Sequence, residues 1–247
     1  MLLPFYILKG NILLFKRLCL TTLLFITSSS VAFAGIVINS TRVIYPSDEK
    51  EVTAKVLNKG ERPVLIQSWI DEGSIDKNPS DIKVPFVLTP PINRVDPEKG
   101  QTLRIRYVGG EELPKDRESL FWLNVLEIPA KSENIESRNK VQVAFRTRIK
   151  ILYRPNNLML DINDASNALS WERVENGIVI NNTTPYYFSI SKVFTNNKNE
   201  FIPGEMIPPK SDKLFKLSTD NIKGNNLKIE YINDYGALVT SKVNLKY

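Results

Sequence analysis

The chain consists of short segments in which apolar and polar residues alternate. Before residue 155 they cover residues 35–45, 51–57, 63–70, 86–89, 101–108, 119–128 and 139–155. Successive side chains of a strand point to opposite faces, so this alternation predicts half-buried strands. Trp69, in the third segment, is expected to point into a core. We find no helical pattern of ten residues or more, and the spacing predicts an all-β sandwich.

The pattern restarts after Pro155 and predicts a second, smaller β-sandwich. Its segments cover residues 158–162, 168–174, 177–181, 186–194, 212–217, 227–232 and 238–245, with a proline-rich loop over 203–209. A chain of this length exceeds the ~100–150 residues typical of one domain. We therefore expect two domains, residues 35–155 and 156–247, joined by a short link.

Residues 1–34 have the features of a signal peptide. They hold no acidic residue, carry three cations near an apolar run at 18–26, and end in Ala32-Phe33-Ala34, a small-x-small cleavage site. The apolar run is shorter than the ~20 residues that span a membrane. We expect export, cleavage after Ala34 and no stable membrane insertion of the mature chain, although an uncleaved anchor remains an alternative because residues 2–8 are also apolar.

Composition argues against most catalytic and metal sites. The chain has no histidine, and its single cysteine, Cys19, lies in the leader. The commonest general base, thiol nucleophiles and the usual zinc ligands are therefore missing. The net charge of +6 falls to +3 once the three leader cations leave, and no basic cluster interleaved with aromatics suggests a nucleic-acid surface. We predict no enzyme activity, no cofactor, no metal, no nucleic acid and no small-molecule substrate.

The segment from Asn139 to Pro155 is the strongest candidate for a binding element. Its first half is apolar at alternate positions, and its second half is basic: Val141, Val143, Phe145; Arg146, Arg148, Lys150. Such a strand suits β-augmentation, in which an extended partner pairs along a sheet edge. The alternative is an ordinary sandwich strand that covers its own core.

Several motifs in order along the chain resemble the PapD-like periplasmic chaperones of the chaperone–usher pilus pathway. In the first domain they are Ser40-Thr41-Arg42, Thr89-Pro90-Pro91 with Arg94 and Pro97, Leu113-Pro114-x-Asp116-Arg117-Glu118-Ser119-Leu120-Phe121-Trp122, Asn124 with Glu127-Ile128-Pro129, and Thr147-x-Ile149-Lys150-x-x-Tyr153-Arg154-Pro155. In the second domain they are Asn182-x-Thr184-Pro185-Tyr186-Tyr187 and Tyr231-Ile232-Asn233-Asp234-Tyr235-Gly236. No single motif is specific, but together they span nearly the whole mature chain.

The resemblance implies two immunoglobulin-like β-sandwich domains at an angle, with a cleft between them. By motif position, Arg42 and Lys150 would anchor the C-terminal carboxylate of a pilus subunit in that cleft through charge-assisted hydrogen bonds. Val141, Val143 and Phe145 would complete the open core of the subunit by donor-strand complementation. Lys150 and Phe145 differ in parity, so in a regular strand they face opposite ways. Either the strand twists or bulges between them, or the end of the subunit wraps around the edge of the strand.

The resemblance also implies an interdomain ion network of Glu118, Arg154 and Asp234 that fixes the angle between the domains. The implied partners are pilus or fimbrial subunits and an outer-membrane usher, and the implied location is the periplasm. The moderate loop at 130–138 and the cysteine-free mature chain place the sequence with the short-loop, disulfide-free members. Two rivals remain: a structural or adhesive component of a surface fibre, and a secreted glycan-active enzyme, which the lack of a convincing acid pair disfavours.

Overall fold

The computed structural model describes residues 35–110, 112–129, 143–194, 201–216 and 224–246. Nearly all of the regular structure is β-strand, and it forms two domains with separate hydrophobic cores. The predicted all-β, two-domain fold is thus confirmed. Predicted site residue Val141 lies outside the described residues.

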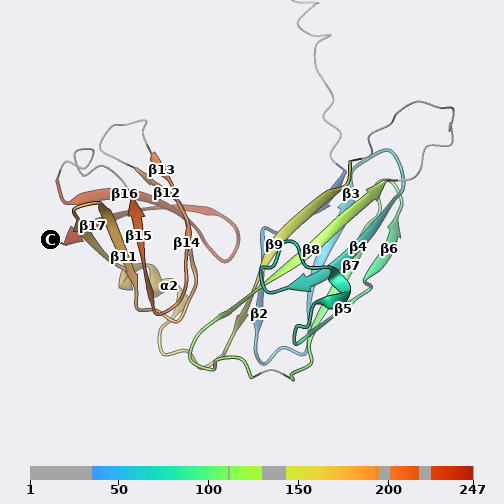
Figure 1. The fold of residues 1–247 in the computed structure, drawn as a ribbon, viewed down its shortest axis with the longest axis horizontal. Helices are drawn as coiled ribbons and strands as arrows, with labels where there is room; N and C mark the ends of the chain where they lie inside the picture. The colour runs from blue at the N-terminus through green and yellow to red at the C-terminus, as the bar shows by residue number, and fades with distance from the viewer. Residues whose placement is uncertain (1–34, 111, 130–142, 195–200, 217–223, 247) are drawn as a thin grey trace, which may run out of the picture. The chain divides into compact units, whose positions relative to one another are not determined.

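The first domain packs two sheets face to face (Figure 1). The four-stranded sheet has the order β1 (Ile36–Ile38), β3 (Val52–Asn58), β7 (Gly100–Tyr107), β5 (Phe86–Thr89). The five-stranded sheet has the order β2 (Arg42–Pro46), β9 (Phe145–Arg154), β8 (Ser119–Pro129), β4 (Val64–Asp71), β6 (Ile92–Val95), and a 3-10 turn covers Pro79–Asp81. All pairings are antiparallel except that of β2 with β9, which is parallel.

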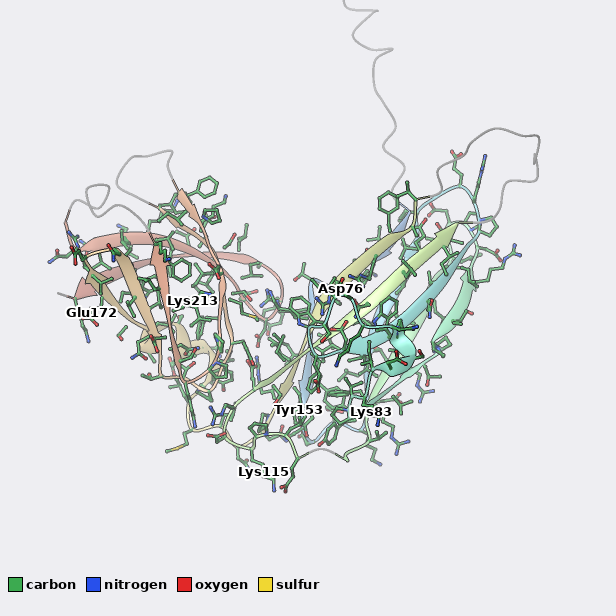
Figure 2. The ribbon with its side chains drawn as sticks, viewed as in Figure 1. Asp76, Lys83, Lys115, Tyr153, Glu172 and Lys213 are labelled. Atoms are coloured by element: carbon green, nitrogen blue, oxygen red, sulfur yellow. The ribbon has the colours of Figure 1, made fainter. Side chains whose placement is uncertain are left out.

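The core of the first domain contains an aromatic cluster that fixes the end of β9. The Tyr153 ring, labelled in Figure 2, lies 4.8 Å from Tyr107, 5.6 Å from Tyr45 and 6.2 Å from Phe86 between ring centroids. The Tyr45 hydroxyl accepts a hydrogen bond from the Tyr107 amide at 2.9 Å and donates to the Lys50 carbonyl at 3.1 Å. A buried aromatic with a satisfied hydroxyl is a strong packing anchor, so the C-terminal half of β9 is firmly held.

The second domain begins with a short helix, α2 (Ile162–Ala165), and a 3-10 turn at Ser166–Ala168. Its strands pair in the order β13 (Phe201–Pro203), β12 (Phe188–Phe194), β16 (Asn226–Ile232), β17 (Leu238–Lys246), β10 (Ser170–Val174), β11 (Gly177–Asn182), β15 (Ser211–Lys216), and β14 (Met206–Ile207) also pairs with β12. The long strand β17 pairs with both β16 and β10. Among the residues that the structure describes, no helix is long and apolar enough to cross a membrane.

Four local predictions differ from the structure. The strand expected at 158–162 is absent because the Asp161 side chain caps α2 by accepting from the Asn163 amide. Strand β6, which follows Pro90-Pro91, lies outside the predicted segments, and β14 lies within the loop predicted over 203–209. Trp69 does not face the core: the next residue, Ile70, is the core residue, and Trp69 lies on the outer face beneath the Arg146 guanidinium at 5.9 Å.

Candidate functional site

The N-terminal half of β9 forms an unpaired sheet edge. Strand β8 pairs with β9 from Phe145 to Tyr153, whereas β2 pairs with it only from Lys150 to Arg154. The reason is that β1 belongs to the opposite sheet, so the chain joins the β9 sheet only at Arg42. Within the described residues, the β2 side of β9 has no strand partner before Lys150.

The backbone groups at this edge can be identified from one hydrogen bond. The Ser47 amide, just after β2, donates to the Arg154 carbonyl at 2.8 Å, so Arg154 turns its backbone polar groups toward β2. Backbone direction alternates along a strand. Arg148 and Arg146 therefore present their N–H and C=O groups to the unpaired edge, while Thr147 turns its own toward β8.

The side chains of β9 separate into a core half and an exposed half. Ile149, Ile151 and Tyr153 belong to the core, whereas Phe145, on the same face, is 67% exposed. Val143, just before the strand, is 56% exposed. The apolar face thus continues past the end of its own core, which an ordinary core strand would not require.

The β8–β9 pairing has no register shift between Phe145 and Lys150. Lys150 therefore lies on the outer face and Phe145 on the core-side face, and no bulge brings them together. A bound strand would therefore contact Lys150 on the outer face of β9 and Phe145 on its core-side face.

We expect Arg146→Pro to weaken partner binding about fivefold while leaving the free protein folded. Proline removes an N–H that points to the unpaired edge, and one hydrogen bond is worth about 1 kcal/mol. Arg146→Ala is the control for the lost side chain, and Thr147→Pro, which removes a β8 bond, should destabilise the free protein. Thermal unfolding and partner titration of the three variants check this, and equal binding by the Pro and Ala variants at position 146 would contradict it.

Arg42 and Lys150 lie opposite one another at the point where the edge becomes free. One Arg42 terminal nitrogen donates to the Ile232 carbonyl at 3.2 Å, and its buried Nε has no hydrogen-bond partner. Lys150 Nζ donates to Ser189 Oγ at 3.4 Å. Neither cation forms an ion pair with any residue in the described part of the chain. The pair therefore retains donors for an incoming anion.

Burial makes this pair costly in the free protein. Burial lowers the pKa of Arg42, although the charges of Asp234 and Glu118 oppose this effect. Burial, with the nearby charge of Arg42, also lowers the pKa of Lys150. Two partly desolvated cations side by side would be stabilised by a bound carboxylate.

A pocket of about 220 Å³ opens beside Arg42. It is lined by Arg42, Ile162, Asn163, Ser166, Tyr187, Phe188, Tyr231, Ile232, Asn233, Asp234, Tyr235 and Val239. A ligand in this pocket would contact Arg42 together with aromatic and polar side chains.

In the part of the chain that the structure covers, no group of three His, Cys, Asp or Glu side chains is placed to hold a metal ion.

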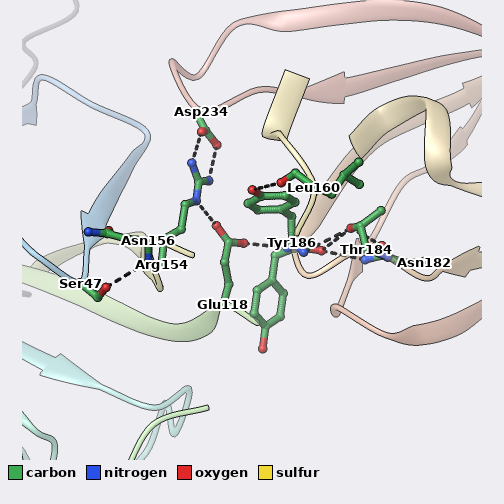
Figure 3. A network of polar contacts seen from close by, with 10 residues as sticks. Ser47, Glu118, Arg154, Asn156, Leu160, Asn182, Thr184, Tyr186 and Asp234 are labelled. Carbon is green, nitrogen blue, oxygen red and sulfur yellow. Dashed lines mark hydrogen bonds and ion pairs between the residues drawn. The ribbon is translucent and has the colours of Figure 1, made fainter. Parts of the chain in front are cut away.

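Glu118, Arg154 and Asp234 form one network, drawn in Figure 3. Arg154 donates from Nε to Glu118 at 2.7 Å and from both terminal nitrogens to Asp234 at 2.7 and 3.0 Å. The other Glu118 oxygen accepts from the Tyr187 amide at 2.7 Å, and the Glu118 side chain is only 1% exposed. Burial alone would lower the pKa of Arg154, but its bonds to Asp234 and the charge of Glu118 raise it above its ordinary value.

This network joins the end of β9 to the turn between β16 and β17. It is buried at Glu118, so it differs from the exposed ion pairs that contribute little to stability. The structure thus brings Glu118, Arg154 and Asp234 into direct contact, as the resemblance implied.

Sequence reasoning missed a second polar cluster on the outer face of the five-stranded sheet. Asp71, only 1% exposed, forms an ion pair with Arg148 and accepts from Asn124 Nδ2 at 2.8 Å. The Arg148 guanidinium also lies 4.4 Å from the centre of the Trp122 ring. The alternating cations of β9 were visible in the sequence, but the carboxylate partner of Arg148 lies 77 residues away and could be assigned only through the register.

Comparison with protein families gives matches to both domains. The pili and flagellar-assembly chaperone model, PapD N-terminal domain, matches residues 35–159. The pili assembly chaperone PapD C-terminal domain model matches residues 164–243.

Individual relatives cover almost the whole chain. The probable fimbrial chaperone YadV of Escherichia coli is 42% identical over 238 residues, 92% of this chain and 96% of the relative. The chaperone protein MrkB of Klebsiella pneumoniae is 40% identical over 225 residues, 90% of this chain and 96% of its own.

Solved structures agree. The CupB2 chaperone of Pseudomonas aeruginosa superposes with a TM-score of 0.73 at 37% identity, covering 85% of this chain and all of that one. The Salmonella enterica SafB chaperone, solved in complex with the SafA pilin, gives a TM-score of 0.73 at 26% identity over 88% of this chain and 99% of that one. With both domain models matched in order and relatives this similar along their full length, the chain belongs to the PapD family of pili assembly chaperones.

Proposed function

We propose that this protein is a periplasmic chaperone that captures pilus subunits on the free edge of β9 and delivers them to an outer-membrane usher. The observation that carries the proposal is the position of Arg42 and Lys150. Two cations without an ion pair among the described residues stand where β2 stops covering β9, at the start of a free edge with exposed apolar side chains. Family membership supports the same role, and a role as a binding protein rather than an enzyme.

The anchor determines the direction of the bound strand. The terminal carboxylate of the subunit would lie at Lys150, and its chain would extend from there along β9 toward Phe145. The N-to-C direction of the subunit strand is then the same as that of β9. The added strand is therefore parallel to β9, like β2, and it continues the position of β2 beyond Arg42. Its backbone would pair with Arg148 and Arg146, and Phe145 and Val143 would enter the open core of the subunit.

The two parts of the site have different roles. An apolar side chain that becomes fully buried contributes ~1.5–3 kcal/mol, so Phe145 and Val143 supply much of the affinity. The carboxylate anchor fixes the register, since a slip of one residue would turn the wrong face toward the groove. We also propose that Val141 takes part in subunit binding with Val143 and Phe145, and that the leader is cleaved after Ala34. Both residues lie outside the part of the chain that the structure describes.

The direct test is capture of a subunit in the periplasm. The chaperone is coexpressed with a fibre subunit encoded in its own gene neighbourhood, and the periplasmic extract is purified through a tag on the chaperone. A one-to-one complex is expected, and the subunit alone should aggregate or be degraded. A subunit that accumulates folded and soluble without the chaperone would contradict the proposal.

Phe145→Asp should weaken subunit capture at least about 100-fold and leave the stability of the free protein unchanged. Phe145 is exposed in the free protein but would be buried in the complex, where an unpaired carboxylate is unfavourable. Ile149→Asp is the matched control: it lies on the same face of the same strand but is 7% exposed in the core, so it should unfold the protein. Thermal unfolding and capture are measured for both, and a large loss of free-protein stability in Phe145→Asp would place Phe145 in its own core.

A further inference from the structure

A single row of side chains crosses the outer face of the five-stranded sheet and ends at the proposed anchor. The strand register places Asp71 opposite Trp122, Trp122 opposite Lys150, and Lys150 opposite Arg42. The residues next to these on their strands, such as Ile70, Phe121 and Ile151, face the core. Lys150 therefore lies between an indole ring on one side and a guanidinium on the other.

Two cations share the Trp122 ring. The Arg148 guanidinium carbon lies 4.4 Å from the ring centre, and Lys150 Nζ lies 5.6 Å from it. Both distances are within the ~6 Å at which an aromatic ring attracts a cation. Arg148 is itself fixed by its ion pair with Asp71, whose oxygens also accept from Asn124 Nδ2 and, at 2.7 Å, from the Gly73 amide. The ring is thus packed against a rigid, buried polar cluster.

Lys150, in contrast, has little else to hold it. Its remaining polar contact among the described residues is the 3.4 Å hydrogen bond to Ser189, at the limit of hydrogen-bonding distance. A lysine side chain has a flexible four-carbon stem, and ordering it to bind a ligand costs conformational entropy. A ring that already restricts this stem reduces the cost.

We propose that Trp122, held in place by Arg148 and Asp71, is a positioning residue that keeps the Lys150 ammonium ordered between its ring and Arg42 for carboxylate binding. This inference rests on the proposed anchor of Arg42 and Lys150, and it adds Trp122 as the residue that positions Lys150. Trp122 does not contact the carboxylate itself. It acts through Lys150.

A merely structural role for Trp122 is the competing explanation, and Trp69 provides the control. Trp69 occupies the next row of the same face, where its ring lies 5.9 Å from the Arg146 guanidinium, and it pairs across the strands with Asn124 rather than with an anchor residue. A general effect of removing an outer-face indole would appear equally at both positions. An effect on Lys150 would appear only at Trp122.

The test uses acetate as the carboxylate probe, so that it does not depend on any particular subunit. The purified protein is titrated with acetate while the ε-methylene protons of Lys150 and the Nε–H of Arg42 are followed by NMR. In the wild type, the Lys150 ε-protons should show an upfield ring-current shift. Trp122→Leu should remove that shift and weaken acetate binding about three- to tenfold, whereas Trp69→Leu should change neither.

Site-specific fluorination of Trp122 provides a second measurement that preserves the shape of the ring. Each added fluorine withdraws electron density from the ring face, so acetate affinity should decrease stepwise with fluorine number. Affinity that stays constant or increases on fluorination, or an equal loss in Trp69→Leu, would overturn the positioning role. Absence of acetate binding to the wild type would overturn the anchor, and the role of Trp122 with it.

Discussion

Lys150→Met should weaken subunit capture by about 30-fold to several thousand-fold while leaving the free protein at least as stable as the wild type. Truncating one partner of a buried charged hydrogen bond typically costs 2–5 kcal/mol of binding free energy. In the free protein, however, the Lys150 ammonium is partly buried beside Arg42 without an ion pair among the described residues, and its pKa is lowered for that reason. Replacing it with an apolar side chain of similar length removes an unfavourable charge.

Titration of the subunit's C-terminal strand peptide against both proteins, together with thermal unfolding, checks this prediction. The melting temperature should stay the same or increase by about 2–4 °C, the change that 1 kcal/mol causes in a protein of this size. Amidating the peptide's C-terminus is the matched control, because it should weaken binding to the wild type more than binding to Lys150→Met, in which only Arg42 is left to hold the carboxylate. If amidation weakens binding to both proteins equally, Lys150 does not hold the carboxylate.

The pH dependence provides an independent check on the same residue. Lys150 binds a carboxylate only as the ammonium, and its lowered pKa means that the proton leaves below the ordinary value of 10.5. Capture should therefore decline as pH rises through this alkaline range. The contribution of Lys150 to stability should change in the opposite direction: the unfolded chain keeps the proton up to 10.5, so this contribution to the free energy of unfolding increases with pH across the same window. Both contributions should be missing in Lys150→Met, so the difference between the two proteins measures them.

The strand pattern of β9 illustrates what the sequence could predict. Alternation separated the two faces of the strand correctly, including the opposite parity of Phe145 and Lys150. It could not tell where the core ends, because Ile149 and Phe145 are equivalent in the pattern. Only the packing shows that one is buried and the other exposed. The free edge likewise depends on where β2 begins, which is set by the chain changing sheets before Arg42.

Trp69 and Trp122 show where sequence reasoning fails. A tryptophan in a β-rich run is usually assigned to the core by its hydrophobicity, yet both rings lie on the outer face beneath the cations of β9. Their environment is decided by partners far away in sequence, which no local pattern contains. The role proposed for Arg42 came only from the resemblance, since in isolation this residue has the pattern of an ordinary surface charge.

Arg154→Met should lower the free energy of unfolding by about 3–5 kcal/mol, the typical cost of leaving a buried charge without its partner. The Glu118 side chain is 1% exposed, and without Arg154 the Tyr187 amide would be its one remaining hydrogen-bond donor among the described residues. The same change removes both hydrogen bonds to Asp234. At ~2–4 °C per kcal/mol, the melting temperature should fall by roughly 6–20 °C.

Two further variants separate the buried charge from the lost packing. Adding Glu118→Gln to Arg154→Met replaces the stranded carboxylate with a neutral amide that can still accept from Tyr187, so the double variant should be more stable than Arg154→Met alone. Arg104→Met is the surface control, because its bond to Glu51 is exposed on both sides and its loss should have no measurable effect. Calorimetry of the four proteins decides the question. If Arg154→Met is as mild as Arg104→Met, the network does not stabilise the fold, whereas rescue by Glu118→Gln would identify Glu118 as the group that makes Arg154 necessary.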